Sequence, residues 1–266
     1  KGRSWELRQK SNLLWPKWIK FLQQYNENLT IDKPLIQLTT KKENFEKLCN
    51  FISNHPEREV KVLNKNSSII KNINEVFNIK YLRGIISYKD GRIDPISLLK
   101  KLNIYLKNKN INFINEEIIK IRKVNNQWIS TCKNKFEIEC DLIILCNSLD
   151  SIKLINLNSH NIKLKPVLGQ AMEIEVNDAE VDLLSLPKQF NINGKNIIPK
   201  SKNKLIIGST DEYTTRPEEN TFEKLTSFLD KKPNWLMKGK ISKKWHGIRS
   251  RPEGEPSPIM KILEDG

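Results

Sequence analysis

The segment from Ile138 to Cys146 carries apolar side chains on both faces of a strand over its second half, from Leu142 onward. Such a strand offers no polar face to water, so it has to lie inside a sheet that is covered on both sides, as parallel sheets are. The residues before it read as one helix and several short strands. We therefore predict that Asp94 to Cys146 contribute to a mainly parallel sheet.

A different pattern surrounds this region. After Leu149, short strands follow one another through turns, which is typical of an antiparallel sheet. We group them with the strands between Leu35 and Ser87, so an α/β (α+β) chain passes twice through a second sheet. The expected helices cover 4–25, kinked or restarted at Pro16, 42–53, 67–78, a segment from Pro95 with Asp94 as N-cap, and 221–230. The expected strands cover 35–38, 81–87 with a bulge at Gly84, 112–114, 117–123, 127–132, 138–146, 164–175, 196–199, 205–209 and 239–247.

Three short segments carry the most specific pattern in the chain. They are LKPVLGQAM at 164–172, NIIPK at 196–200 running into LIIGST at 205–210, and WHGIRSRP at 245–252, with DGRIDP upstream at 90–95. In order and spacing they resemble the D-amino-acid oxidase superfamily of FAD-dependent oxidoreductases. Members of that family pair a Pro-x-x-Gly-Gln turn, a hairpin that ends in Gly-x-Thr, and a Trp-x-Gly-apolar-Arg strand.

The resemblance implies two interleaved domains and a redox activity. Residues 1–34, 91–160 and 248–266 would belong to a Rossmann-like FAD-binding domain that is incomplete in this chain. Residues 35–90 and 161–247 would form an antiparallel-sheet substrate domain. The implied reaction is the oxidation of an amine or amino acid, as in glycine and D-amino-acid oxidases, with hydride transfer to FAD. The chain would then be an enzyme acting on a small molecule.

The glycine-rich loop that opens such an FAD domain is missing from the sequence. No two of the ten glycines stand in Gly-x-Gly spacing, and the chain begins at Lys1 without a Met. Only glycine lets the backbone approach the pyrophosphate at a helix N-terminus. We therefore interpret the sequence as an internal piece of a longer flavoprotein, and we expect these residues alone not to retain FAD.

The resemblance also assigns the substrate contacts. Arg249, in the Trp-x-Gly-apolar-Arg strand, would clamp the substrate carboxylate, since a planar guanidinium suits a two-pronged contact. Arg251 would share the face of Arg249 if the strand is regular. Thr210 would border the active site. Asn196 stands where glycine oxidases typically carry a tyrosine near the substrate, so a plain glycine oxidase is not assured. No catalytic acid, base or nucleophile is predicted.

The cofactor contacts are carried over on fewer residues. Gly169 and Gln170 would pass near the flavin ring, and the strand at Ile118 would meet the adenine. After the buried run, the family normally reads Ala-x-Gly, whereas this chain has Cys146, Asn147 and Ser148. Serine in place of that glycine puts a Cβ where the backbone usually approaches FAD, which leaves the affinity for FAD open.

Composition bears on the remaining partners. The chain has 46 Lys and Arg against 31 Asp and Glu, a formal charge of +15. The lysines are spread along the chain among Asn and Ile, which indicates compositional bias, so a nucleic-acid partner is not expected. The four cysteines and three histidines show no ligand spacing, so we expect no metal and a cytoplasmic protein with reduced thiols. The longest apolar run is too short to span a membrane. The oligomeric state is left open.

Two alternatives to an amine or amino-acid oxidoreductase remain. The first is the oxidoreductase domain of a tRNA wobble-uridine modification enzyme, which shares this fold and would suit the positive charge. The second is a degenerate member without catalysis, which Ser148, Asn196 and the missing glycine loop would suit. Flavin absorbance of the natural protein separates the second from the others, and salt-dependent tRNA binding would favour the first.

Overall fold

The sequence folds into a mixed arrangement of helices and strands. The computed structural model describes residues 3–25, 29–155, 162–177, 179–255 and 257–262. The helices are α1 (Arg3–Leu22), α2 (Lys42–Asn54), α3 (Ser68–Phe77), α4 (Pro95–Lys107), α5 (Thr221–Thr226) and α6 (Asn234–Met237), with short 3₁₀ turns η1 (Gln23–Tyr25), η2 (Pro56–Arg58), η3 (Ser148–Lys153) and η5 (Leu183–Ser185). The strands are β1 (Ile31–Asp32), β2 (Leu35–Thr39), β3 (Val60–Leu63), β4 (Arg83–Ser87), β5 (Arg92–Ile93), β6 (Ile118–Val124), β7 (Gln127–Cys132), β8 (Glu137–Cys140), β9 (Leu164–Glu175), β10 (Phe190–Ile192), β11 (Lys195–Ser201), β12 (Lys204–Gly208) and β13 (Lys240–Pro252).

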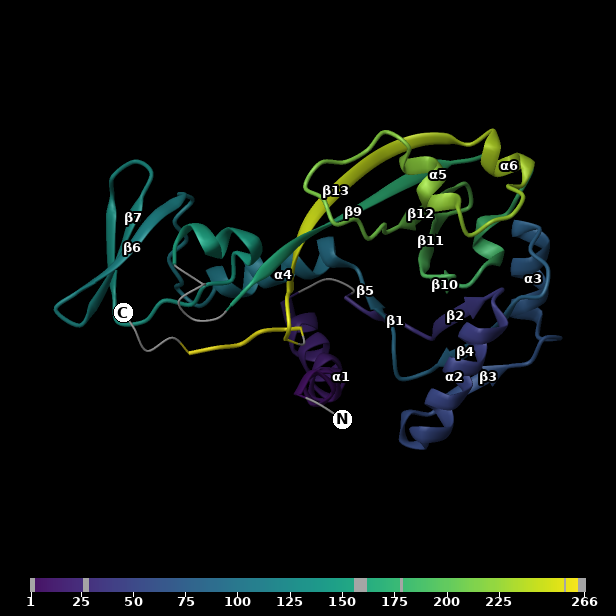
Figure 1. Cartoon of the computed structure of the whole chain (residues 1–266), viewed down its shortest axis with the longest axis horizontal. Helices are drawn as coiled ribbons and strands as arrows, with labels where there is room; N and C mark the ends of the chain where they lie inside the picture. Colours follow the sequence, from purple (N-terminus) through teal and green to yellow (C-terminus); the bar gives the residue numbers. More distant parts are fainter. Residues whose placement is uncertain (1–2, 26–28, 156–161, 178, 256, 263–266) are drawn as a thin grey trace.

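An eight-stranded sheet forms the larger end of the molecule, in the order β13-β9-β12-β11-β10-β2-β4-β3 (Figure 1). It confirms that the strands from Leu35 to Ser87 share one sheet with those after Leu164. The sheet is mixed and not wholly antiparallel, because β10 pairs with β2 in parallel. This pair joins the two passes of the chain through the sheet. In sequence, the two passes are separated by the residues that form the smaller end of the molecule.

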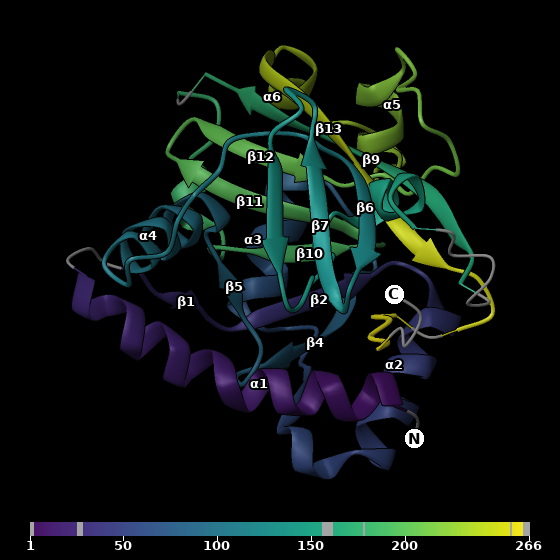
Figure 2. The ribbon, with the colours of Figure 1, turned by 90° about the vertical axis from the view of Figure 1, so that its left-hand side faces the viewer.

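The smaller end holds a three-stranded sheet, β6-β7-β8, which stands in front of the larger sheet in Figure 2. All its pairs are antiparallel, so the expected mainly parallel sheet between Asp94 and Cys146 is wrong for the part of the chain described. The run after Leu142 forms no strand there, and Leu142 and Ile144 are 72% and 77% exposed. A parallel strand needs neighbours to bond its backbone, and no described strand lies beside this run.

Two local predictions also change. The expected strand at 112–114 is absent, since these described residues are irregular and exposed. Gly84 lies in a regular part of β4 without a bulge. A Cβ at Gly84 would lie 2.3 Å from the carbonyl oxygen of Gln37 and 2.4 Å from the side chain of Leu38. Glycine is required here because β2 and β4 approach closely, and not because the strand is kinked.

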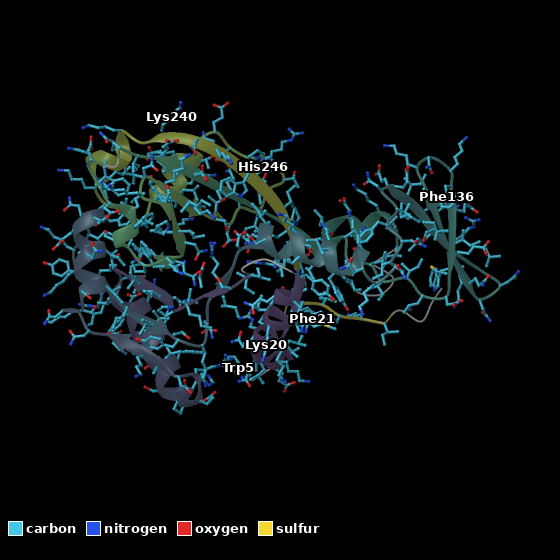
Figure 3. The ribbon with its side chains drawn as sticks, turned by 180° about the vertical axis from the view of Figure 1, so that it is seen from behind. Trp5, Lys20, Phe21, Phe136, Lys240 and His246 are labelled. Carbon is cyan, nitrogen blue, oxygen red and sulfur yellow. The ribbon has the colours of Figure 1, made fainter. Side chains whose placement is uncertain are left out.

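Helix α1 runs without a break through Pro16 and packs on α4, so the helix does not restart at this proline. Asp94 caps α4 as predicted: its Oδ2 accepts a hydrogen bond from the Ser97 N–H at 3.0 Å. No helix among the described residues combines the length and the apolar content that a membrane crossing requires. The side chains of α1 and of the small sheet, with Trp5, Phe21 and Phe136, are drawn in Figure 3.

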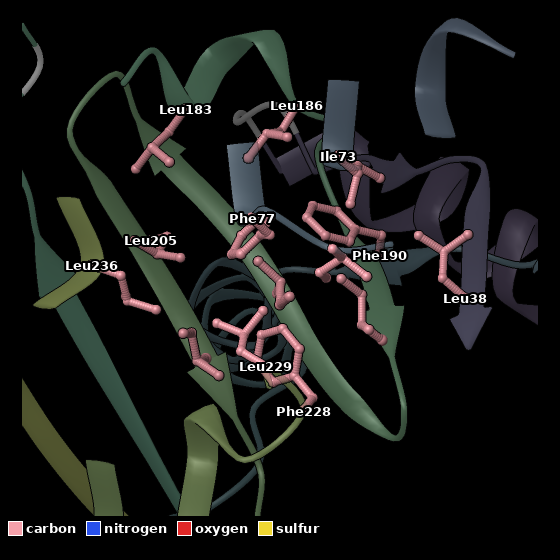
Figure 4. Close-up of a cluster of buried hydrophobic side chains, with 14 of the residues drawn as sticks. Leu38, Ile73, Phe77, Leu183, Leu186, Phe190, Leu205, Phe228, Leu229 and Leu236 are labelled. Atoms are coloured by element: carbon pink, nitrogen blue, oxygen red, sulfur yellow. The ribbon is translucent and has the colours of Figure 1, made fainter. Parts of the chain in front are cut away.

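The main core lies where α3, α5 and α6 cover one face of the eight-stranded sheet (Figure 4). Phe77 of α3 is at its centre and is fully buried. Its ring lies 6.0 Å from that of Phe190, 6.1 Å from that of Phe228 and 5.4 Å from that of Trp235. Aromatic side chains from both passes of the chain therefore meet at one helical residue, which ties the two passes together.

Replacing Phe77 with Ala should lower the free energy of unfolding by about 3–5 kcal/mol, because it removes a buried ring and leaves a cavity. Urea denaturation measures the loss. Phe136→Ala is the matched control, since Phe136 is 55% exposed and its truncation should cost less than about 0.5 kcal/mol. Similar losses for the two variants would contradict this assignment of the core.

Candidate functional site

Strand β9 pairs antiparallel with β13 along one edge and with β12 along the other, and so places the three sequence motifs side by side. Gly169 pairs with Gly247, and Val167 pairs with Arg249. Gly169 and Gln170 were expected in a turn, but they lie within β9. Because successive residues of a strand point to opposite faces, Gly169 and Gln170 serve different sides of the sheet.

Arg249 occupies the face of Gly169. Its Nη2 donates to the Thr210 carbonyl oxygen at 3.0 Å and to Asp211 Oδ1 at 2.6 Å, and its side chain remains 52% exposed. A Cβ at residue 169 would lie 2.9 Å from that same Nη2. A side chain at 169 would therefore displace the guanidinium from its present position. The result is an accessible cation held over bare backbone.

Gln170 and Thr210 point to the other side and are buried. The Gln170 N–H donates to Thr210 Oγ1 at 2.9 Å, and the Thr210 hydroxyl donates to Glu212 Oε1 at 2.6 Å. The Gln170 amide donates to the same Glu212 oxygen at 2.8 Å and accepts from the Thr221 hydroxyl at 2.8 Å. Both side chains are thus engaged in a polar network, and only the Thr210 carbonyl reaches Arg249.

Glu212 is the charged centre of this network. Burial raises the pKa of its carboxyl, but hydrogen bonds from Gln170, Lys224 and Thr210 outweigh burial and lower the pKa to about 2. Lys224 Nζ lies 2.6 Å from Glu212 Oε2. Sequence reasoning missed Glu212, although it follows the Gly-x-Thr motif by only two residues. Its function here is to fix the segment after β12, which carries the Thr210 carbonyl and Asp211.

The other predicted substrate residues lie at the edges of this face. Arg251 Nη1 donates to the Tyr213 hydroxyl at 3.0 Å, so both arginines of β13 contact the 210–213 segment. Asn196 is exposed on β11 opposite Gly208, and its Oδ1 accepts from the Asn191 amide at 3.1 Å. The structure brings Arg249, Arg251 and the Thr210 carbonyl together, whereas Asn196 lies on β11, which is separated from β13 by β9 and β12.

Ser148 takes up a glycine-like backbone. Its φ is 57°, in the left-handed region that favours glycine. Its hydroxyl donates to Ser250 Oγ at 2.9 Å and so links the turn η3 to β13, beside Arg249. The serine therefore keeps the conformation that a glycine would have and directs its Cβ toward β13. Cys146 is exposed two residues earlier, and Ile118 is half-buried at the start of β6.

Acid should remove the contribution of Glu212 to stability. Its folded pKa of about 2 lies below the value of 4.5 for a free Glu, so the stabilisation is complete above pH 4.5 and is lost as the pH falls toward 2. At pH 7, Glu212→Gln should lower the melting temperature by roughly 3–10 °C. The difference from wild type should shrink between pH 4.5 and the lowest pH at which the protein still melts cooperatively.

Glu223→Gln is the control for this test, because Glu223 is 63% exposed and pairs with Lys232 at the surface. It should change the melting temperature by a degree or two at any pH. A pH-independent deficit in the Glu212 variant would mean that the network does not depend on the charge of Glu212.

Comparison with known proteins places this geometry in a family. The family described as DAO, FAD dependent oxidoreductase, matches residues 1–262. No curated protein is similar enough in sequence to count as a relative. Solved structures with the same fold include glycine oxidase from Geobacillus kaustophilus, with a TM-score of 0.74 and 19% identity over 95% of this chain and 69% of that one.

Two further structures resemble it equally. Iminodiacetate oxidase from Chelativorans sp. BNC1 has a TM-score of 0.74 and 15% identity, over 94% of this chain and 69% of its own. L-proline dehydrogenase from P. horikoshii has a TM-score of 0.76 and 13% identity, over 96% and 69%. At these identities the structures establish a shared fold, and the family match covers nearly the whole chain. The chain belongs to the DAO family of FAD-dependent oxidoreductases.

Proposed function

We propose that the natural protein containing these residues oxidises an amine or amino acid, and that Arg249 binds the carboxylate of the substrate. The family supports a flavin oxidoreductase. Proteins of the same fold are named for glycine, iminodiacetate and L-proline, all of which join a nitrogen to a carboxylate-bearing carbon. When bound, FAD supplies the acceptor for the hydride that leaves this carbon.

The described residues fit part of an FAD site. Gly169 has no side chain, and the guanidinium of Arg249 lies over its backbone, so a ring that approaches Gly169 also approaches Arg249. At the other end, Ser148 keeps a glycine-like conformation near Cys146, and Ile118 begins the adjoining small sheet. We propose these residues, together with Gln170, as the contacts of the ring and the adenosine. The sequence holds no Gly-x-Gly loop for the pyrophosphate, so these residues do not supply that part of the site.

We also propose the division into two interleaved domains that was predicted from the sequence, because the packing of the sheets and helices supports it. The eight-stranded sheet draws on 35–90 and on the residues after 161, and its edge strand β13 continues to Pro252. Helices α1 and α4 pack on each other apart from that sheet. The boundary at 160–161 and the end of the chain at 263–266 lie outside the described residues.

The position of Arg249 is the observation that carries the substrate proposal. Its guanidinium is half exposed, lies over Gly169 and faces away from the main core. Arg251 contributes a second positive charge two residues further along β13. An anion that approaches Gly169 therefore contacts the guanidinium of Arg249. This arrangement orients the substrate, which is what a flavin reaction needs most from its protein.

Arg249→Ala and Arg249→Lys should both lower kcat/KM for a carboxylate-bearing amine, such as glycine or N-methylglycine. Loss of a charge-assisted contact of about 1.5–3 kcal/mol corresponds to a decrease of roughly 10- to 150-fold. Lysine keeps the charge but not the two-pronged geometry, so its effect should be closer to that of alanine than to wild type. Steady-state kinetics on FAD-loaded protein measure the change.

An amine without a carboxylate should lose far less activity in the same variants. Lys240→Ala is the control, since Lys240 is exposed at the far end of β13 (Figure 3). Flavin content should be equal in all the proteins. Equal losses for both kinds of amine would mean that Arg249 supports the fold or the cofactor, and the assignment of an amino-acid substrate would fail.

A further inference from the structure

The ion pair between Asp211 and Arg249 lies at the surface, so it is not a buried pair that stabilises the fold. The two side chains are 62% and 52% exposed, and Asp211 Oδ1 lies 2.6 Å from Arg249 Nη2. Exposed pairs contribute little to stability. Asp211 instead places a carboxylate on the group that is proposed to receive the carboxylate of the substrate.

The hydrogen-bonding positions of the Arg249 guanidinium are already occupied where a substrate carboxylate would bind. A carboxylate can bind arginine in two two-pronged ways, through Nε with Nη2 or through Nη1 with Nη2. Both use Nη2, and Nη2 has only two hydrogens. In this structure one is directed to the Thr210 carbonyl at 3.0 Å and the other to Asp211 at 2.6 Å. A substrate carboxylate can therefore form a two-pronged contact only if Nη2 releases one of these partners.

Asp211 is the partner that can leave. The Thr210 carbonyl is fixed because the Thr210 side chain is buried in the Glu212 network. Asp211 is at the surface, and its carboxylate also interacts electrostatically with a second cation, Lys195. Burial lowers the pKa of Lys195, and the charges of Asp211 and Glu212 partly oppose that effect. Lys195 Nζ donates to the carbonyl of Ser209, two residues before Asp211, at 3.4 Å.

We propose that Asp211 is a specificity-determining residue that competes with the substrate carboxylate for Arg249. This inference rests on the proposed function of Arg249. Asp211 acts on binding and not on the reacting atoms, so it raises KM for amines with one carboxylate and leaves kcat unchanged. The site then disfavours substrates that bind only through one carboxylate. A substrate needs further contacts on this face of the sheet to displace Asp211 from Arg249.

The experiment measures binding of ¹³C-acetate by NMR titration, which needs no turnover, in wild-type protein and in Asp211→Asn and Asp211→Ala variants. Both variants should bind acetate roughly 3- to 10-fold more tightly than wild type, since the competing charge is gone. Glu223→Gln is the matched control, because it removes an equally exposed carboxylate from a 2.7 Å pair with Lys232; its affinity should equal that of wild type.

Arg249→Ala distinguishes the possible outcomes. Adding it to wild type or to Asp211→Asn should abolish the acetate binding. Equal affinity of wild type and both Asp211 variants, weaker binding by the variants, or tighter binding that persists without Arg249 would each overturn the inference.

The proposed function is tested separately by amine turnover on FAD-loaded protein. There, Asp211→Asn should lower KM for glycine by a factor similar to the gain in acetate affinity. A change in kcat instead of KM would also overturn the inference. Tighter, Arg249-dependent acetate binding in a protein that oxidises no amine would support the competition between Asp211 and a carboxylate while removing the proposed enzyme activity.

Discussion

The pairing of β13 with β9 is the interaction on which the rest of the candidate site depends. The two strands pair from Lys240 opposite Glu175 to Pro252 opposite Leu164, with one shift of register between Ile241 and Lys243 and an unbroken register from Lys243 onward. This register sets Arg249 beside Gly169 and brings its guanidinium to the segment after β12. It also carries Ser250 to Ser148, so that the turn η3 is bonded to the same strand. Shifting the register by one residue would turn Arg249 to the opposite face.

The segment from Thr210 to Glu212 divides its groups between two environments. Thr210 and Glu212 direct their side chains into the polar network behind the sheet, where Gln170, Thr221 and Lys224 complete the hydrogen bonds. Asp211 points to the open face. The side chain of Glu212 is only 11% exposed, and a carboxylate so far removed from water is tolerated only with such partners, so Glu212 fixes the backbone. Because that backbone is fixed, Arg249 meets the Thr210 carbonyl in a defined place, whereas the Asp211 side chain that pairs with it is 62% exposed.

Much of the local structure followed from sequence patterns. Helices α2 and α3 begin and end within two residues of the predicted positions, and α4 begins at Pro95 as predicted, because their apolar spacing and the Asp94 cap are local signals. The two-sheet organisation followed from the contrast between buried and turn-linked strands. The run from Leu142 failed as a strand because a parallel strand depends on hydrogen bonds from neighbours, which no local pattern supplies. The straight course of β4 at Gly84 likewise depends on how closely β2 approaches.

The sequence by itself determined the family and predicted that Arg249 and Gly169 belong to the site, since the motifs are fixed residues at fixed spacings in one chain segment each. Tertiary structure decided which groups surround them. That Thr210 turns inward, that Ser148 keeps a glycine-like backbone and that Asp211 occupies Nη2 are consequences of contacts between residues separated by about 40 or more positions in the chain, or of the fixed backbone that those contacts create. Such contacts depend on the pairing of strands in space, and the physical reason is that strand register is specified by the whole buried face of a sheet and not by any one strand.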